Sequence, residues 1–343
     1  MSAGFRPTPP AANDAIAWPA DFGQRYTIFV DTEEEFDWSA PFDRDQRSVT
    51  AAAAIPAAAR RFAALGTPLT YLVDHPIATD PAAIDPIRRA IADHDGAVGA
   101  QLHPWVNPPY DELADAATSF AGALPRALEA AKLVTLTRAI GEAFVQPPKI
   151  YRAGRYGLGP NTLDLLAGQG YRADSSMRAR YDYARLGGPD YVGIGNHAFR
   201  TGTAGIVELP LTTVYTGHLR SAGPVLHRFA ERLPGGVGAL ARLGLVNRIA
   251  LTPEEMPLDE ALEAVRIVLG EGLALLNFSF HSPSLVPGHT PYVKDAAQLA
   301  DFWRWWDAVL TLLATHGVRA VGHDELLAAL PCPCADTGTP VSG

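Results

Sequence analysis

A group of carboxylates follows directly on a short apolar run near the N-terminus. The run Ile28-Phe29-Val30 leads into an acidic segment made up of Asp31, Glu33, Glu34, Glu35 and Asp37. An apolar run of this kind is typical of a buried strand. Carboxylates crowded where a strand ends repel one another and lose hydration, which costs free energy unless a cation, a proton or an arginine balances them. The segment therefore indicates a site for a metal ion or for acid–base chemistry.

Asp31 and Glu33 are the two acids for which we favour a functional role. Side chains alternate along a strand, so these two share a face and Thr32 points to the other. One carboxylate of such a pair can bind a cation while the other takes a proton. For Glu34, Glu35 and Asp37 we favour a solvated acidic loop.

Polar residues also end other apolar runs. Gln101 and His103 share a face in the segment 99–105, where His103 is either a neutral metal ligand or a structural histidine. Arg152 follows Ile150 and Tyr151, and could form a charge-assisted pair with a carboxylate such as Asp31. His281 ends the run 274–280 and is placed as a general acid, with a buried structural histidine as the alternative.

Two further strand ends are weaker candidates. Asp174, Ser175 and Ser176 follow the predicted strand 171–174, where they could support the site by hydrogen bonding or cap the next segment. His75 follows the predicted strand 70–73 and is a secondary candidate. The remaining histidines lack such a position.

The rest of the sequence supplies the elements that must position these residues. Strand-like and helix-like segments alternate over roughly residues 25–330, and repeated strand–helix units favour a parallel sheet with helices outside. Turn-rich sequence between residues 187 and 215 predicts an inserted β-hairpin. The units are too many for a small open sheet, so we predict a closed or nearly closed β/α barrel. In such barrels reactive residues lie at the carboxyl ends of the strands.

Composition and the chain ends narrow the class of protein. The formal net charge of -9 argues against nucleic acid as the main partner. No apolar run has the length of a membrane span, and no secretory signal is visible. The cysteines, Cys332 and Cys334, cannot form a disulfide framework or a four-ligand zinc site, which fits a cytoplasmic protein. We predict an irregular N-terminal arm (1–24), a single domain (25–330) and a flexible C-terminal tail (331–343).

Taken in order, these motifs resemble the polysaccharide deacetylase family, also called the NodB-homology or carbohydrate esterase family 4 group. The resemblance covers roughly residues 25–330, and the segments 31–38 and 103–105 are most similar to a WalW-like subgroup. The matching positions, in motif order, are Asp31 and Glu33, the segment 99–105, Arg152, Asp174 and His281.

The resemblance implies a distorted (β/α)7-type barrel and a fuller set of roles. It implies hydrolysis of a C–N amide bond, with N-deacetylation of an N-acetylated sugar or polysaccharide precursor as the favoured activity. A divalent ion, expected to be zinc, would be bound by Glu33 and His103 with Gln101. Asp31, oriented by Arg152, would be the base, and His281 the acid. Residues that could contact the sugar, or else belong to the core, are Trp38, Trp105, Arg155 and Tyr156.

One departure from the family pattern keeps other functions open. The family has two histidines four residues apart, but Gln101 and Trp105 stand at those positions and His103 lies between them. The alternatives are an amidohydrolase acting on a non-sugar bond, or a catalytically degraded barrel that binds a glycan or a protein. The oligomeric state is not indicated.

Overall fold

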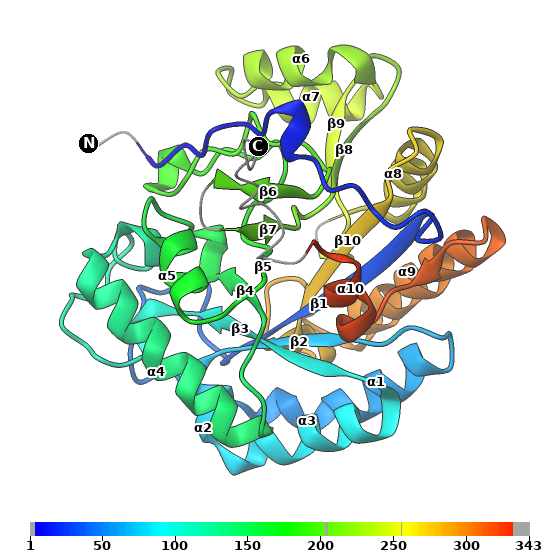
Figure 1. The fold of residues 1–343 in the computed structure, drawn as a ribbon. Coiled ribbons are helices and arrows are strands. Elements are labelled where there is room, and N and C mark those ends of the chain that lie inside the picture. The colour runs from blue at the N-terminus through cyan, green and yellow to red at the C-terminus, as the bar shows by residue number, and fades with distance from the viewer. Residues whose placement is uncertain (1–3, 203–204, 255, 332–343) are drawn as a thin grey trace, which may run out of the picture.

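The centre of the molecule is a curled parallel sheet. The structure is a computed structural model that describes residues 4–202, 205–254 and 256–331, so Cys332, Cys334 and the predicted tail beyond residue 331 lie outside the described residues. The parallel strands follow one another around the sheet in the order β10-β1-β2-β3-β4-β5-β7 (Figure 1). Their bounds are β1 Arg25–Thr32, β2 Thr70–Val73, β3 Ala97–Leu102, β4 Ile150–Ala153, β5 Ala173–Asp174, β7 Ile206–Glu208 and β10 Leu275–His281. The predicted β/α barrel is confirmed as an incompletely closed one.

Two short strands complete the sheet. The predicted hairpin is β6 (Phe199–Thr201) paired antiparallel with β7, and β11 (Arg319–Ala320) pairs parallel with β1. A second, two-stranded sheet of β8 (Thr213–Thr216) and β9 (Asn247–Ala250) was not predicted. The backbone beside it bonds to β10, since Thr212 N donates to Asn277 O and Ser279 N donates to Leu251 O, both at 3.2 Å. Irregular backbone thus fills the gap between β7 and β10.

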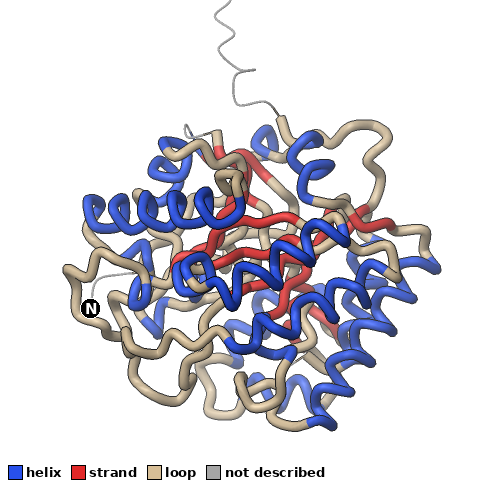
Figure 2. The backbone as a smooth tube through the Cα atoms, turned by 90° about the horizontal axis from the view of Figure 1, so that it is seen from below, coloured by secondary structure: helices blue, strands red, loops and turns tan. Residues whose placement is uncertain are grey.

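Helices cover the outside of the curled sheet (Figure 2). The helix α9 shows why: Phe302, Trp306 and Leu313 recur at helical spacing and are buried against the sheet, where Trp306 meets Phe280 edge-on at 5.7 Å. The helix bounds are α1 Ile55–Ala63, α2 His75–Thr79, α3 Pro81–His94, α4 Arg126–Phe144, α5 Thr162–Gly168, α6 Gly223–Ala230, α7 Gly236–Arg242, α8 Leu258–Gly270, α9 Ala296–Thr315 and α10 His323–Ala329.

Strand alternation divides the core into two layers. Ile28 and Val30 of β1 belong to the outer layer beneath the helices, whereas Phe29 faces inward. The inner layer is apolar at the amino ends of the strands, where Ile16 and Phe22 of the N-terminal arm and α10 pack against it. The predicted irregular arm therefore covers the end of the barrel at which the parallel strands begin. The opposite end of the inner face is polar.

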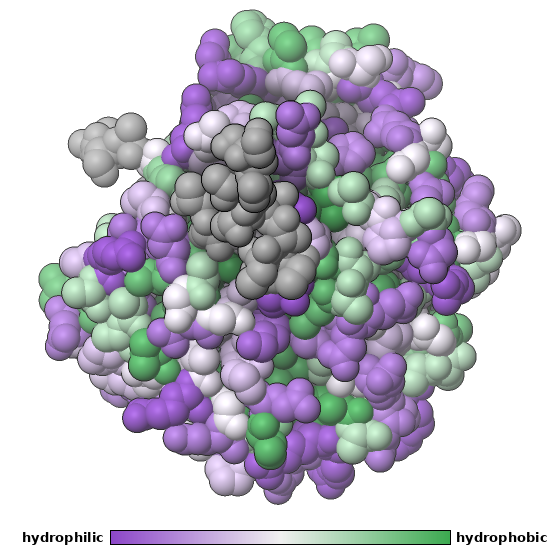
Figure 3. Space-filling view, viewed as in Figure 1, coloured by the Kyte–Doolittle hydropathy of each residue, from purple (hydrophilic) through white to green (hydrophobic). Residues whose placement is uncertain are grey.

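A patch of exposed apolar side chains lies on α6 and just after α7, at the top of Figure 3. Val225, Phe229 and Leu243 are 72%, 61% and 68% exposed. Among the described helices, none combines the length and the apolar character that crossing a bilayer requires.

Candidate active site

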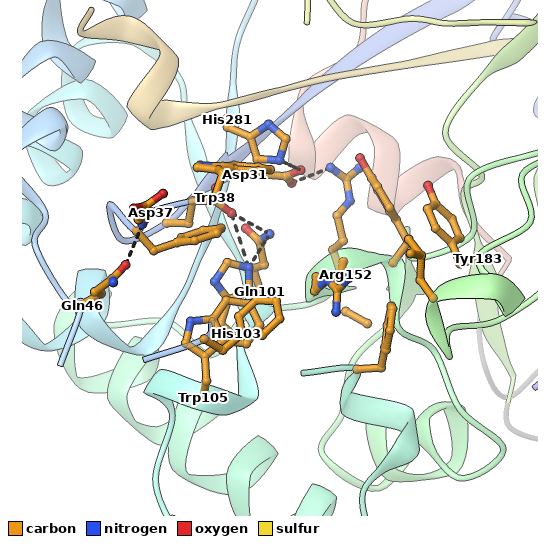
Figure 4. Close-up of a pocket in the computed structure, with 18 of the residues that line it drawn as sticks. Asp31, Asp37, Trp38, Gln46, Gln101, His103, Trp105, Arg152, Tyr183 and His281 are labelled. Carbon is orange, nitrogen blue, oxygen red and sulfur yellow. Dashed lines mark hydrogen bonds and ion pairs between the residues drawn. The ribbon is translucent and has the colours of Figure 1, made fainter. Parts of the chain in front are cut away.

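A cavity of about 360 Å³ opens at the carboxyl ends of the strands. Asp31 of β1, Gln101 of β3, Arg152 of β4 and His281 of β10 all line it (Figure 4). Each occupies an inward-facing position of its strand, because its two strand neighbours belong to the outer layer or to the helix side of the sheet. Residues that lie 250 positions apart in the chain, Asp31 and His281, are direct partners in the parallel ladder. The parallel strands thus bring these side chains together on a rigid support.

Arg152 holds Asp31 in a buried ion pair. Its Nη1 donates to Asp31 Oδ1 at 2.5 Å, and both side chains are almost fully buried. The rest of the guanidinium is bound to Ser175, with Nε donating to the backbone oxygen at 2.9 Å and Nη2 to Oγ at 3.0 Å. A guanidinium engaged on three sides has little freedom to rotate. Asp31 is therefore fixed with Oδ2 free to face the cavity.

Glu33, Gln101 and His103 converge beside Asp31. His103 Nε2 lies 3.4 Å from Glu33 Oε2, and Gln101 Nε2 lies 3.3 Å from both of these atoms. Two oxygens of the cluster, Glu33 Oε1 and Gln101 Oε1, are buried and have no hydrogen-bond partner among the described residues. Burial raises the pKa of Glu33 to about 8. Buried acceptors left without donors fit a cation at this point.

His103 is oriented from behind by Glu34. Its Nδ1 lies 2.7 Å from Glu34 Oε2, and Trp105 Nε1 donates to Glu34 Oε1 at 2.8 Å. With Nδ1 bound to a carboxylate, Nε2 is the nitrogen left to face Glu33 and Gln101. The prediction that Glu34 is solvated is wrong, because its side chain is completely buried. Glu35 is half-buried and accepts hydrogen bonds from the hydroxyls of Ser48 and Thr50. Asp37 is exposed, as predicted.

Glu34, Asp74 and His103 offer a second place where a cation would have three ligand atoms close together. These atoms already have partners, however. Asp74 Oδ2 accepts from Glu34 N and Oδ1 accepts from Ile77 N, both at 2.8 Å, and Glu34 binds His103. Burial raises the pKa of both Asp74 and Glu34, that of Glu34 to about 7. We therefore assign this group to orienting His103.

His281 is bound to a carboxylate that the sequence analysis missed. Glu254 Oε2 lies 2.6 Å from His281 Nδ1, and Oε1 accepts from His281 N at 3.0 Å and from Ser284 Oγ at 2.7 Å. His281 Nε2 faces Asp31 Oδ2 at 3.8 Å. Burial lowers the pKa of His281, but the charges of Glu254 and Glu33 outweigh burial and raise it to about 10. The imidazole is thus held as a proton donor that faces the cavity.

Aromatic and basic side chains form the remaining wall. Trp38 is partly exposed, at 37%, and meets His281 edge-on at 5.3 Å. Trp105 lines the cavity but is buried, and its ring stacks on that of His103 at 4.3 Å, so this stacking face is not available to a sugar. Arg155 and Tyr156 line the cavity and are half-buried.

Two candidates from the sequence lie away from the cavity. Asp174 accepts from Ser176 Oγ at 2.5 Å, and burial raises its pKa and that of the neighbouring Glu208. It supports the strand end, whereas the next residue, Ser175, contacts Arg152. His75 begins α2 and does not line the cavity. No signal in the sequence marks Glu254 or Glu208 as partners. No strand was predicted to end near Glu254, and Glu208 lies inside the predicted strand 207–211, which returns to the main sheet, rather than at its end.

The fold is that of several solved structures. A protein assigned as a polysaccharide deacetylase from Mycobacterium smegmatis matches with a TM-score of 0.55 and 17% identity, over 94% of each chain. Puue allantoinase matches with a TM-score of 0.52 and 14% identity, over 94% of this chain and 93% of the other. A 4-alpha-glucanotransferase from Thermococcus litoralis matches with a TM-score of 0.51 and 11% identity, over 89% of this chain and 40% of the other. No protein-family model matches the sequence, and no curated protein matches it.

These likenesses confirm the resemblance at the level of the fold. The three structures are named for a deacetylase, an allantoinase and a glucanotransferase, so one fold carries different reactions. The reaction of this chain must therefore be argued from its own side chains.

Proposed function

We propose that this protein hydrolyses the C–N bond of an N-acyl group, with N-deacetylation of an N-acetylated sugar or polysaccharide precursor as its activity. One observation carries the proposal. The Asp31 carboxylate lies between Arg152, at 2.5 Å, and His281, at 3.8 Å, in the cavity that also holds Glu33 and His103. A fixed base and a protonated acid on either side of one space are what amide hydrolysis requires.

The residues beside Asp31 fit a divalent ion. Glu33, His103 and Gln101 would hold it, since Glu33 Oε1 and Gln101 Oε1 lack partners and His103 Nε2 lies 3.4 Å from the other oxygen of Glu33. The carboxylate and the imidazole are ligands that zinc takes, and the amide oxygen of Gln101 would be a weaker third one. When bound, such an ion polarises the acyl carbonyl and lowers the pKa of its water.

The protein's own groups then move the protons. Asp31 Oδ2 accepts a proton from the water whose oxygen bonds to the acyl carbon. His281 Nε2 gives its proton to the amide nitrogen as the C–N bond breaks, so the products are a carboxylic acid and a free amine. Because Asp31 Oδ2 and His281 Nε2 lie 3.8 Å apart, the proton taken by the one can replace the proton lost by the other. Arg152 keeps Asp31 oriented throughout.

The test measures acetate release together with metal content. Protein purified without chelator is assayed on N-acetylated mono- and oligosaccharides with added zinc and other divalent ions. We expect Asp31→Asn to lower kcat by about 10²- to 10⁴-fold. Asp45→Asn is the matched control, because Asp45 is an exposed acid nearby in the sequence that does not line the cavity, and the variant should leave the rate unchanged. Absence of acetate from every substrate with every ion would contradict the proposal.

A non-sugar amidohydrolase is the second candidate, favoured by the similar match of Puue allantoinase to the whole chain. Both candidates share the same base and acid, so the substrate panel decides between them. It therefore includes N-acyl amino acids and cyclic ureides. Protein that contains no metal and hydrolyses none of these, but binds a glycan, would support a binding role instead.

A further inference from the structure

The end of the cavity away from Glu33 contains arginines without acidic partners. Arg152, Arg155 and Arg178 all line the cavity. Arg152 is paired with Asp31, whereas neither Arg155 nor Arg178 forms an ion pair with any carboxylate of the described residues. At the opposite end, Asp31 is paired with Arg152 and Glu254 with His281, so the acids there have cationic partners. Arg155 and Arg178 are therefore the cavity-lining arginines whose charge no acid of the described residues balances.

Arg178 is held by aromatic rings rather than by an acid. Its guanidinium carbon lies 3.9 Å from the ring centre of Tyr181 and 5.6 Å from that of Tyr156. Its guanidinium lies beside the hydroxyl of Tyr183, and its Nε is buried without a hydrogen-bond partner of normal geometry among the described residues. Aromatic faces orient a guanidinium but do not neutralise it. A partly buried cation with an unused donor is a ready partner for an anion.

The turn after β4 connects the two ends of the cavity. Arg155 and Tyr156 both have left-handed backbones, with φ of 55° and 58°, which non-glycine residues rarely adopt. Arg155 lies over the rings of Phe120, at 4.1 Å, and Phe42, at 5.0 Å. A Cβ added to Gly154 would lie 2.3 Å from the His103 ring, so this turn also packs closely on the proposed metal ligand. Arg155 Nη1 also donates to Ala116 O, at 3.3 Å, and to Ser119 Oγ, so the turn holds Arg155 in the cavity wall while contacting the reaction centre.

The arrangement of side chains places Arg178 and its tyrosines away from the proposed metal ligands. In Figure 4, Tyr183 lies on the far side of Arg152 from Gln101 and His103. Tyr156 stacks on Tyr183 at 5.7 Å, which places the two rings together at the arginine end. A ligand that spans the cavity would therefore meet the acids and the proposed metal ligands at one end and Arg178 at the other.

We propose that the substrate carries an anionic oxygen group, a carboxylate or a phosphate, which Arg178 binds with help from Arg155. This inference rests on the proposed function, because it names the substrate class of that same site: an N-acylated sugar acid or sugar phosphate rather than a neutral glycan. Arg178 and Asp31 line the same cavity, so an anionic group bound at Arg178 leaves the N-acyl group of the substrate directed toward Asp31.

The experiment compares three probes: N-acetylglucosamine, its 6-phosphate, and the corresponding N-acetylated uronic acid. Acetate release gives kcat/KM for each, and calorimetry gives binding without the need for turnover. We expect an anionic probe to be preferred by wild type, and Arg178→Met to lower kcat/KM for that probe by about 10- to 100-fold, mainly through KM. The neutral probe should change less than about twofold. The better of the two anionic probes identifies carboxylate or phosphate as the group.

Matched variants separate binding of the anion from damage to the fold. Arg178→Lys should recover part of the preference, because it keeps the charge without the planar fork. Arg180→Met is the control, since Arg180 is also half-buried but donates to Thr213 O at 3.0 Å and does not line the cavity. If Arg178→Met does not fold, Arg155→Met should show the same selective loss.

The outcomes distinguish this inference from the proposed function. Anionic binding that depends on Arg178 but without acetate release would support the anion site and contradict the hydrolase. Acetate release from the neutral probe at least as efficient as from both anionic ones, or equal loss for all probes in Arg178→Met, would overturn the anion site and leave the hydrolase intact.

Discussion

Replacing Arg152 with methionine should strongly destabilise the protein. Arg152 and Asp31 are each about 1% exposed and are joined at 2.5 Å, so the variant leaves a carboxylate buried without its partner. Removing one partner of a buried ion pair costs about 3–5 kcal/mol. The loss also leaves the Ser175 backbone oxygen without the donor that now lies 2.9 Å away. We therefore expect a free energy of unfolding lower by about 3–5 kcal/mol.

A double-mutant cycle isolates the pair itself. Asp31→Asn alone leaves the guanidinium buried and uncompensated, whereas the variant with both replacements has neither buried charge. The double variant should therefore be more stable than the sum of the two single effects predicts, by about 2 kcal/mol. Guanidinium-induced unfolding of metal-free protein, followed by tryptophan fluorescence at constant pH, gives each value.

The exposed pair Arg304–Asp301 is the matched control, because its atoms are also 2.5 Å apart but both side chains are more than 60% exposed. The same cycle there should give less than about 1 kcal/mol. The reasoning fails if the free energy of unfolding of Arg152→Met lies within about 1 kcal/mol of the wild-type value, or if the effects of the two replacements are additive. Either result would mean that burial does not make this ion pair important for stability.

Three further predictions concern buried acids. Glu34→Gln should weaken zinc binding by about 10- to 100-fold in competition with a chelating dye, because Glu34 accepts from His103 Nδ1. Burial raises the pKa of Glu129 from 4.5 to about 7, so this residue should lower stability by about 3 kcal/mol as pH rises through that window, and Glu129→Gln should make the fall in urea unfolding smaller by that amount. Glu254→Gln should lower the pKa of His281 from about 10 by roughly 1 to 3, measured by NMR. As pH is raised, the activity of this variant should then begin to fall at a lower pH than that of wild type.

Each of these predictions has a matched control. Glu35→Gln changes the neighbouring acid, which binds Ser48 and Thr50 and not His103. Equal zinc affinities of this variant and Glu34→Gln would contradict the first prediction. Glu142→Gln alters an exposed acid on the same helix, α4, and should keep the pH slope. Glu271→Gln changes an acid that pairs with an exposed arginine, and an NMR shift there as large as in Glu254→Gln would contradict the third.

Strand alternation made the centre of the site predictable from sequence. Asp31, Arg152 and His281 each end an apolar run, and parallel strands place such ends together, so the fold and the meeting of these side chains could both be inferred. The helix α9 was equally predictable, since the apolar residues that recur at helical spacing in its sequence are the ones on its buried face.

The partners of these residues could not be predicted. Alternation gives a side-chain direction only as far as β1 extends, and β1 ends at Thr32, so it could not place Glu34 against His103. Glu254 follows β9, a strand whose neighbour is set by the tertiary fold rather than by local pattern. The short helix α2, with Asp74 at its N-terminus, was missed for the same reason.

The origin of each cavity residue bears on how such a protein can change. Asp31, Gln101, Arg152 and His281 belong to strands whose positions are fixed by the parallel ladder, whereas Trp38, Arg155 and Arg178 stand on connecting segments. Connecting segments tolerate replacement far better than the strands of a sheet. Exchanging the segments that carry Trp38 and Arg178 should therefore give variants that accept different molecules while the proposed reaction centre is inherited unaltered, which makes this barrel a suitable scaffold for directed evolution.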